Sequence, residues 1–324
     1  INGTLRKYGD RKTTNYYLNN TGLQEANFSI QLEKEWNEKI FVDLYASSFN
    51  SRLGVLRGSH IALPEEIEQA FTLLEPFYTE PNFSYGVDAP KQHVSHQLIK
   101  LKAKYYQNET SVLEFIIAGQ LNDRKEFDIR RSGRSDIPAL SLKQYTVNVD
   151  LTYAKILGDN WNFKIGNQCI VTDNTNNPTG ILPLIPDYLS WENGIFATIS
   201  KKINVVQFKS GIRYDFERQE ALTITNTLPK EILRYKNNFQ NISGLLAWEV
   251  DILDHQSISI YSGLSMRNPE VNELYSNGVH QGVSGIEEGD VNLESEIALK
   301  NILEYKWLPS PSFSLSTLAY HQRF

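Results

Sequence analysis

The sequence predicts an all-β protein, an antiparallel transmembrane β-barrel, and three observations lead to this fold class. Apolar and polar residues alternate strictly over many stretches, most clearly over residues 145–153, so that each strand has one apolar and one polar face. The stretches run for roughly 10–15 residues, whereas strands of globular sheets usually have about 5–6. Short and long links alternate along the chain. All short links therefore fall at one end of the sheet, as in barrels with tight periplasmic turns and long extracellular loops.

About twelve strands follow from this pattern, together with one amphipathic helix at residues 64–74, where a proline and three glutamates precede an apolar face. The expected strands are residues 22–33, 38–49, 92–106, 110–122, 142–157, 160–173, 190–201, 204–217, 236–252, 255–266, 297–308 and 311–324. The short links are 33–37, 107–110, 158–160, 201–203, 253–255 and 309–311, and the long links are about 50–91, 123–141, 174–189, 218–235 and 267–296.

The alternation also predicts which side chains face lipid. Tyr145, Val147, Val149, Leu151 and Tyr153 are expected to point outward, because a slip of one residue would invert every side chain. A nine-residue stripe rises roughly 30 Å along a strand, or about 20 Å vertically at a tilt of ~45°, which is close to the hydrocarbon thickness. The polar residues expected to face the lumen are Lys100, Lys102, Lys104, Gln144, Asn148, Asp150, Lys209, Arg213 and Asp215.

Composition excludes several classes of protein. The 324 residues carry 32 Lys and Arg against 38 Asp and Glu, a net charge of −6 that provides no electrostatic footprint for nucleic acid. A single cysteine, Cys169, excludes a disulfide framework and a cysteine-based zinc site. The sequence contains no run of 18 apolar residues, so it predicts no membrane-spanning helix. A soluble antiparallel sandwich also alternates, but it rarely has a dozen strands of this length with loops segregated by length.

The sequence carries no pattern typical of an enzyme, and we expect no catalytic residue, metal site or cofactor. His93 and His96 resemble a metal pair, but three residues apart on a strand they face opposite sides. Residues 123–136 form the densest block of charge, and its mixed signs are typical of a solvated, salt-bridged loop. Arg130, Arg131 and Arg134 in this block offer the alternative of an anion-attracting patch.

A pair of motifs near the end of the chain is more specific. The first reads Arg267-x-Pro269-x-x-x-Glu273-Leu274-Tyr275, and the second reads Gly289-Asp290-x-x-Leu293-x-x-Glu296. Together they resemble the barrel motifs of TonB-dependent outer-membrane receptors. Further stretches resemble members of the iron-transport type, and the resemblance covers nearly the whole chain. These stretches are residues 20–22, 54–61 (with Arg57 and His60), 124–131 and 179–186.

The resemblance implies a fold and a function. Receptors of this family have a 22-stranded barrel around an N-terminal plug, so residues 1–324 are expected to form part of one barrel domain, with the plug and the last strands outside this chain. The implied function is TonB-energised uptake of a scarce, large nutrient across the outer membrane, with a ferric siderophore or similar iron chelate as the first candidate. The implied partners are outer-membrane lipid, the ferric chelate, and the TonB complex, reached through the missing plug.

Other readings of the same residues stay open. A haem or cobalamin receptor of the same family is one alternative, and a passive porin or an adhesin-like barrel is another. A soluble carbohydrate-binding β-protein is a third. The presence of an upstream plug in the full gene would distinguish a receptor from a porin, and the detergent-free solubility of the intact protein would favour the third alternative.

The resemblance also suggests site residues. Haem-transporting relatives carry a ligand histidine between the two motifs, where this sequence has His280, and an imidazole nitrogen can bind ferric haem. Tyr275 could supply an oxygen or a stacking face. The residues expected to bind ligand are His280, Tyr275, Arg130, Arg131, Arg134, Arg57 and His60, and those expected to have a structural role are Arg267, Pro269, Glu273, Leu274, Gly289, Leu293 and Glu296. We expect Glu273 to accept hydrogen bonds from backbone or from Arg267.

Overall fold

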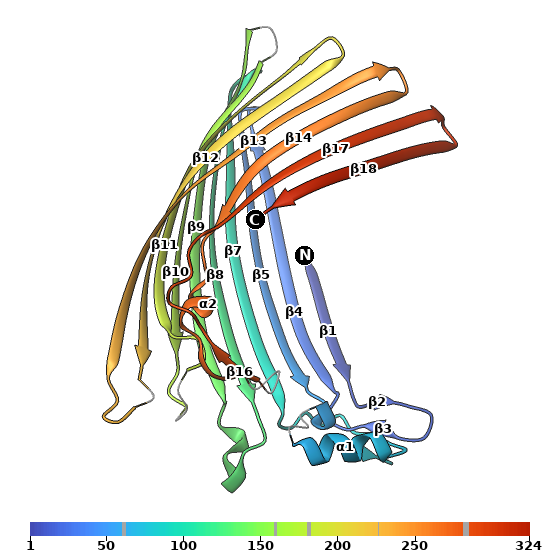
Figure 1. Cartoon of the computed structure of the whole chain (residues 1–324), viewed down its shortest axis with the longest axis vertical. Coiled ribbons are helices and arrows are strands. Elements are labelled where there is room, and N and C mark those ends of the chain that lie inside the picture. The colour runs from blue at the N-terminus through green and yellow to red at the C-terminus, as the bar shows by residue number, and fades with distance from the viewer. Residues whose placement is uncertain (60–62, 159–160, 180–182, 226, 281–284) are drawn as a thin grey trace.

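A computed structural model of the chain shows one large, curved antiparallel sheet that resembles a trough (Figure 1). The structure describes residues 1–59, 63–158, 161–179, 183–225, 227–280 and 285–324. The sheet has thirteen strands in the order β1-β4-β5-β7-β8-β9-β10-β11-β12-β13-β14-β17-β18, with β1 and β18 at its edges. These strands are β1 Asn2–Tyr8, β4 Leu23–Trp36, β5 Ile40–Gly54, β7 Lys91–Asn108, β8 Ser111–Phe127, β9 Leu140–Leu157, β10 Trp161–Asn176, β11 Asp187–Ile203, β12 Val206–Ile224, β13 Ile232–Leu253, β14 Gln256–Arg267, β17 Glu296–Ser310 and β18 Phe313–Arg323.

Smaller elements lie in the long links, all at the same end of the sheet. A three-stranded sheet joins β2, β3 and β6, and a hairpin joins β15 and β16. These elements and the helices are β2 Arg11–Lys12, β3 Tyr17–Leu18, β6 Thr79–Glu80, β15 Asn277–His280, β16 Gly285–Glu288, α1 Pro64–Thr72, α2 Val271–Tyr275 and the 3₁₀ turns η1 Arg57–Ser59 and η2 Arg131–Asp136. No helix in the described part of the chain is long and apolar enough to cross a membrane.

The register of the strands separates the sheet into two faces, as the alternation predicts. Val149 pairs with Ile117 on one side and with Cys169 on the other, so these side chains share one face. Asp150 belongs to the opposite face, which the register continues through Gln168, Gly194 and Asp215 to Asn241. Asn241 hydrogen-bonds to Asn268, in the segment that carries α2 within the concavity (Figure 1). The polar face is therefore the concave, lumen-side face. The alternate residues Tyr145, Val147, Val149, Leu151 and Tyr153 point outward as predicted, and the residues between them point inward.

Aromatic pairs mark two levels on the outer face. Near the short turns, Phe208 packs against Trp248 with ring centroids 5.7 Å apart. Towards the long loops, Trp191 packs against Phe216 at 5.6 Å. Phe208 and Phe216 are both on β12, so the two levels lie roughly 26 Å apart along the strand, or about 20 Å along the membrane normal at a tilt of ~45°. This separation is suited to the hydrocarbon layer, with the aromatic rings at its two boundaries.

Two sequence-based expectations need correction. The sheet has one strand more than expected, because β1 pairs with β4. The link expected at 218–235 is only residues 225–231, because β12 and β13 continue as a long hairpin beyond the outer aromatic level. The helix expected at 64–74 forms as α1; none of its residues is buried, and Phe71 on its apolar face is 86% exposed.

Asn20 organises the long-loop end of the first strands. Its backbone is left-handed, with φ of 60°, a conformation that asparagine tolerates better than most residues. Its side-chain amide donates to the carbonyl oxygens of Val55 and Pro90 at 2.9 and 2.8 Å, and its Oδ1 accepts from the backbone N–H of Asp88 at 2.8 Å. One buried side chain therefore joins three segments that are distant in sequence.

Candidate functional site

The long link between β14 and β17 folds back into the concavity, and we call residues 268–295 the strap. Its helix α2 packs on the inner wall of the sheet, where Val271, Leu274 and Tyr275 are buried together with Ala221 of β12. Leu274 is only 1% exposed. An isolated helix of five residues has little stability of its own, so this apolar contact with the wall holds α2 in place. The partly buried aromatic residues around it are Tyr188, Tyr235 and Phe239.

The two ends of the strap are fastened by the residues of the Arg-x-Pro motif. The guanidinium of Arg267 donates to both carboxylate oxygens of Glu273, at 2.7 and 3.1 Å, and it also binds Glu296, with which it forms a cross-strand pair. Glu273 Oε2 further accepts the backbone N–H of Glu270 at 2.8 Å, which completes a capping box at α2. Glu273 thus accepts from both Arg267 and backbone, as the sequence predicts. Pro269 contributes its carbonyl oxygen, an acceptor for Gln219 at 3.2 Å.

Gly289 allows the two halves of the strap to approach each other. Its N–H donates to the carbonyl oxygen of Ser276 at 2.7 Å, and the next N–H, of Asp290, donates to Glu273 at 2.9 Å. A Cβ at position 289 would lie 2.5 Å from the carbonyl carbon of Leu274 and 2.6 Å from the backbone nitrogen of Tyr275. These neighbours are backbone atoms that cannot rotate away, so only glycine fits here. Leu293 of the same motif is 42% exposed, and its N–H donates to the carbonyl oxygen of Asp290 at 3.3 Å.

Replacing Gly289 with alanine is therefore expected to loosen the strap, at a cost of about 1–3 kcal/mol for the backbone shift that the added methyl group requires. Amide hydrogen exchange of Ser276 and Asp290 in the full-length protein measures this cost, because the strap must open to expose them. Gly278→Ala is the matched control, since a Cβ there has its nearest neighbour at 3.9 Å. Equal exchange rates in the two variants would contradict this account of Gly289.

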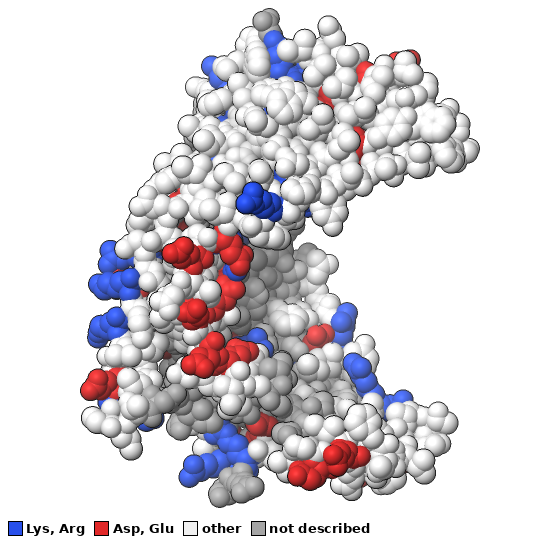
Figure 2. All heavy atoms as spheres, in the orientation of Figure 1, with Lys and Arg blue, Asp and Glu red and all other residues white. Residues whose placement is uncertain are grey.

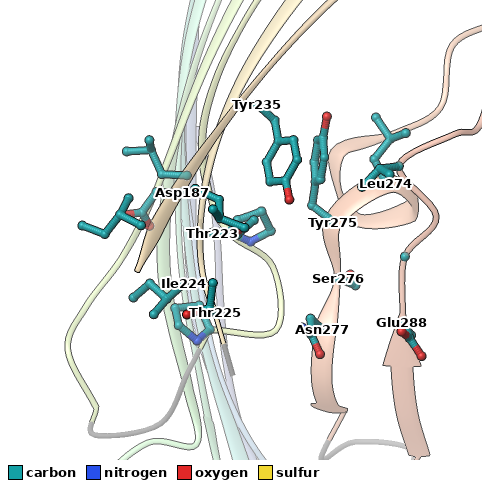
Figure 3. Close-up of a pocket in the computed structure, with 17 residues that line it drawn as sticks. Asp187, Thr223, Ile224, Thr225, Tyr235, Leu274, Tyr275, Ser276, Asn277 and Glu288 are labelled. Carbon is teal, nitrogen blue, oxygen red and sulfur yellow. The ribbon is translucent and has the colours of Figure 1, made fainter. Parts of the chain in front are cut away.

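A pocket of about 290 Å³ lies between the strap and the ends of β12 and β13 (Figure 3). Tyr235 and Tyr275 stack at its upper edge, with ring centroids 4.6 Å apart and an interplanar angle of 28°. Ser276 is 4% exposed, and its hydroxyl has no hydrogen-bond partner among the described residues. The other lining residues are Pro183, Pro186, Asp187, Leu222, Thr223, Ile224, Thr225, Ile232, Leu233, Leu274, Asn277, Glu288, Gly289 and Val291, so no lysine or arginine is among the described residues of the lining.

Tyr275 lines this pocket, and its hydroxyl is engaged in a hydrogen bond. Its hydroxyl accepts a hydrogen bond from Asn237 Nδ2 at 2.6 Å. Burial raises the pKa of the Tyr275 hydroxyl. Both ligand roles suggested by the sequence for Tyr275, an oxygen or a stacking face, stay predictions.

The structure does not bring the other expected ligand residues to this pocket. His280 lies on β15, where its Nδ1 contacts Glu287 of β16. Arg57 stacks over the ring of Tyr78 at 4.4 Å, and Arg130 donates to the carbonyl oxygen of Pro138 at 2.8 Å. Arg134 is exposed on η2. His60 and the side chain of Arg131 lie outside the described part of the structure.

Metal-binding residues are not grouped in the part of the chain that the structure describes: no three His, Cys, Asp or Glu side chains are arranged to hold an ion. His93 packs against Phe127, and His96 contacts Gln120 at 3.1 Å. The wall residues Tyr235 and Asn237 were not foreseen, because their strand pattern resembles that of any other polar face. Only the contacts of α2 identify them as part of the site.

The strap differs in charge from the rest of the chain. It contains six acidic residues and no lysine or arginine, while the remainder has 32 acidic residues against 32 Lys and Arg. The strap therefore accounts for the whole formal charge of −6. Figure 2 shows these acidic side chains gathered over α2 and β16. Burial, together with the charges of Glu217 and Glu273, raises the pKa of Glu270.

Comparisons with known proteins agree with the sequence motifs on the fold. No family model and no curated protein matches the chain. Among solved structures, the copper transporter OprC is similar, with 12% identity and a TM-score of 0.71 over 99% of this chain and 49% of that protein. The ferric-catecholate import receptor Fiu from Escherichia coli K12 has 10% identity and a TM-score of 0.71, over 98% of this chain and 53% of that protein. The ferric yersiniabactin uptake receptor FyuA from Yersinia pestis has 11% identity and a TM-score of 0.62, over 99% of this chain and 48% of that protein.

These neighbours are transporters and receptors, and none of the three is described as an enzyme. The chain spans about half the length of each. At such low sequence identity the likeness concerns the fold, which agrees with the strand length, the segregated loops and the Arg-x-Pro motif. The chain has the fold of part of the barrel of a TonB-dependent receptor.

Proposed function

We propose that the full-length protein is an outer-membrane receptor for TonB-energised uptake of a scarce, large nutrient, and that the nutrient is a ferric siderophore or a similar iron chelate. The observation that carries this proposal is the strap pocket at the long-loop end of a sheet with the receptor fold. Long loops of such barrels face the cell exterior, so the pocket lies where a ligand arrives. Lipid surrounds the outer face, and TonB acts through a plug outside this chain.

Growth of a deletion strain tests this proposal. On defined media that supply iron only as individual ferric chelates, the deletion is expected to abolish growth on at least one chelate, and the intact gene is expected to restore it. Parallel media with haem or with cobalamin distinguish the alternatives in the same family. Normal growth on every chelate, with a defect only on haem or cobalamin, would reject the iron-chelate proposal.

Haem is the second candidate, because His280 lies on the strap and its side chain is partly exposed. If haem is the cargo, His280→Ala is expected to remove the ferric haem spectrum that the full-length receptor develops in a titration, since one imidazole ligand is lost. His96→Ala is the matched control, as His96 lies on the inner wall and contacts Gln120. An unchanged spectrum and affinity in His280→Ala would remove His280 from the ligand set.

A further inference from the structure

A second cavity, which we call the acidic well, lies on the other side of α2, deeper along the strands than the strap pocket. Its volume is about 220 Å³. The first pocket reaches residues 222–225 of β12, whereas the acidic well is lined by residues 215–217 of the same strand. The lining residues are Glu192, Asp215, Phe216, Glu217, Asn241, Met266, Arg267, Asn268, Pro269 and Glu270.

The carboxylates of the acidic well exceed its cations. Glu192 and Glu217 form a directly opposed cross-strand pair on β11 and β12, and like charges in this position repel each other. Within the described lining, Arg267 is the one basic residue, and its guanidinium is already bound to Glu273 and Glu296. Asp215 is paired with Arg213 at 2.6 Å. Among the described residues, no further cation neutralises Glu192, Glu217 and Glu270.

A chain of amide hydrogen bonds fixes which atoms point into the acidic well. Both carboxylate oxygens of Glu217 accept, one from Gln219 Nε2 and one from Asn268 Nδ2, each at 2.6 Å. A carboxylate can only accept, so these contacts determine the orientation of both amide groups. The Oδ1 of Asn268 consequently faces Asn241 and accepts from its Nδ2 at 2.7 Å.

This orientation leaves two buried acceptors without donors. Asn241 lines the acidic well and is 5% exposed, and its Oδ1 has no hydrogen-bond partner among the described residues. The Oε1 of Gln219, a residue that is 3% exposed, is also without a partner there. An unsatisfied buried acceptor costs free energy comparable to a lost hydrogen bond, so a donor at this place would be stabilised. The missing partner is therefore a hydrogen-bond donor, not an anion.

We propose that the acidic well is a subsite for a positively charged group with several N–H donors, such as an ammonium or guanidinium group of the cargo. Such a group would satisfy Asn241 Oδ1 and offset the charges of Glu192 and Glu217 at once. The proposal rests on the proposed receptor function and names its substrate class: a chelate that is cationic, or neutral with a pendant amine. The acidic strap at the entrance favours the same class and disfavours polyanionic chelates.

The test uses two octahedral cobalt complexes of opposite charge and the purified full-length protein in non-ionic detergent. Hexaamminecobalt(III) carries three positive charges and N–H donors, and hexacyanocobaltate(III) carries three negative charges. Both exchange their ligands very slowly, so binding reports charge and hydrogen bonding rather than metal ligation. Calorimetry is expected to show binding of the ammine complex only, with an affinity that falls as salt is added.

Glu192→Gln is expected to weaken binding of the ammine complex about tenfold, since it removes an ionisable carboxyl group that a bound cation would hold in its charged form, and it preserves the side-chain volume. Glu220→Gln is the matched control, because Glu220 lies on the neighbouring strand β12 with its side chain on the outer face. Equal binding of both complexes, no binding of the ammine complex, or equal losses in the two variants would each overturn the proposal. These outcomes do not depend on transport, so a receptor that fails this test can still pass the growth test.

Discussion

Replacing Leu274 with alanine is expected to release the strap from the barrel wall. Leu274 is 1% exposed in the cluster with Ala221, Val271 and Tyr275, and truncation of a buried leucine costs about 2–5 kcal/mol through lost burial and the cavity that remains. Apart from this cluster, α2 is tied to the wall by the hydrogen bonds of Asn237 with Tyr275 and of Gln219 with Pro269, and a helix of five residues has no appreciable stability alone. The loss is therefore expected to appear as local opening of the strap, while the strands stay paired.

Hydrogen exchange of the α2 amides in the full-length protein measures this loss. The opening equilibrium is expected to rise by between about thirtyfold and a few thousandfold, and the exchange of amides in β12 is expected to stay unchanged. Ile286→Ala is the matched control, since Ile286 is in the same strap but 83% exposed. If the two variants exchange alike, or if β12 opens together with α2, the strap is not held by Leu274.

Val149→Arg is expected to destabilise the barrel by about 2–4 kcal/mol, whereas Asn148→Arg is expected to be tolerated. Val149 lies midway along the outward stripe, between Ile117 and Cys169, where a charged side chain would enter the hydrocarbon. Asn148 lies on the inner face and donates to Asp150 at 2.8 Å. An arginine there would remain in the polar lumen and find a carboxylate partner.

Each substitution is the control for the other, because the two positions are adjacent in the same strand and their side chains lie on opposite faces of the sheet. Denaturant titration of the full-length protein folded into lipid vesicles gives the two changes in the free energy of unfolding. Similar destabilisation by Val149→Arg and Asn148→Arg would contradict the assignment of the faces. A larger effect of Asn148→Arg would mean that the two faces are exchanged.

The long strands could be predicted because one constraint acts on every residue of them. A strand with lipid on one side and a polar lumen on the other must alternate, and residues 145–153 follow this rule without exception. β1 was missed because its seven residues, Asn2–Tyr8, contain few apolar side chains, and it forms by pairing with β4. The extension of β12 to Ile224 was missed for a similar reason, since beyond the membrane level the outer face carries charges such as Arg218 and Glu220.

The site could be predicted only where its contacts are local. Arg267, Glu273 and Glu296 belong to a motif whose spacing brings them together at a strand end. Tyr235 and Asn237 meet Tyr275 across about forty residues of sequence, and no local pattern distinguishes them from other wall residues. That Asn241 Oδ1 lacks a hydrogen-bond donor among the described residues depends on the orientation of the Asn241 and Asn268 side-chain amides, and no sequence pattern indicates this orientation.

The ends of the strap are neighbours: Arg267 and Glu296 are opposed residues of adjacent strands. A segment whose two ends meet in this way can change its length without moving the strands, since the entropy of closing a loop grows only slowly with the number of residues. The strap can thus differ in length or sequence while the strands at its two ends stay paired. A segment of different length grafted between these two positions is therefore expected to leave the register of the sheet unchanged.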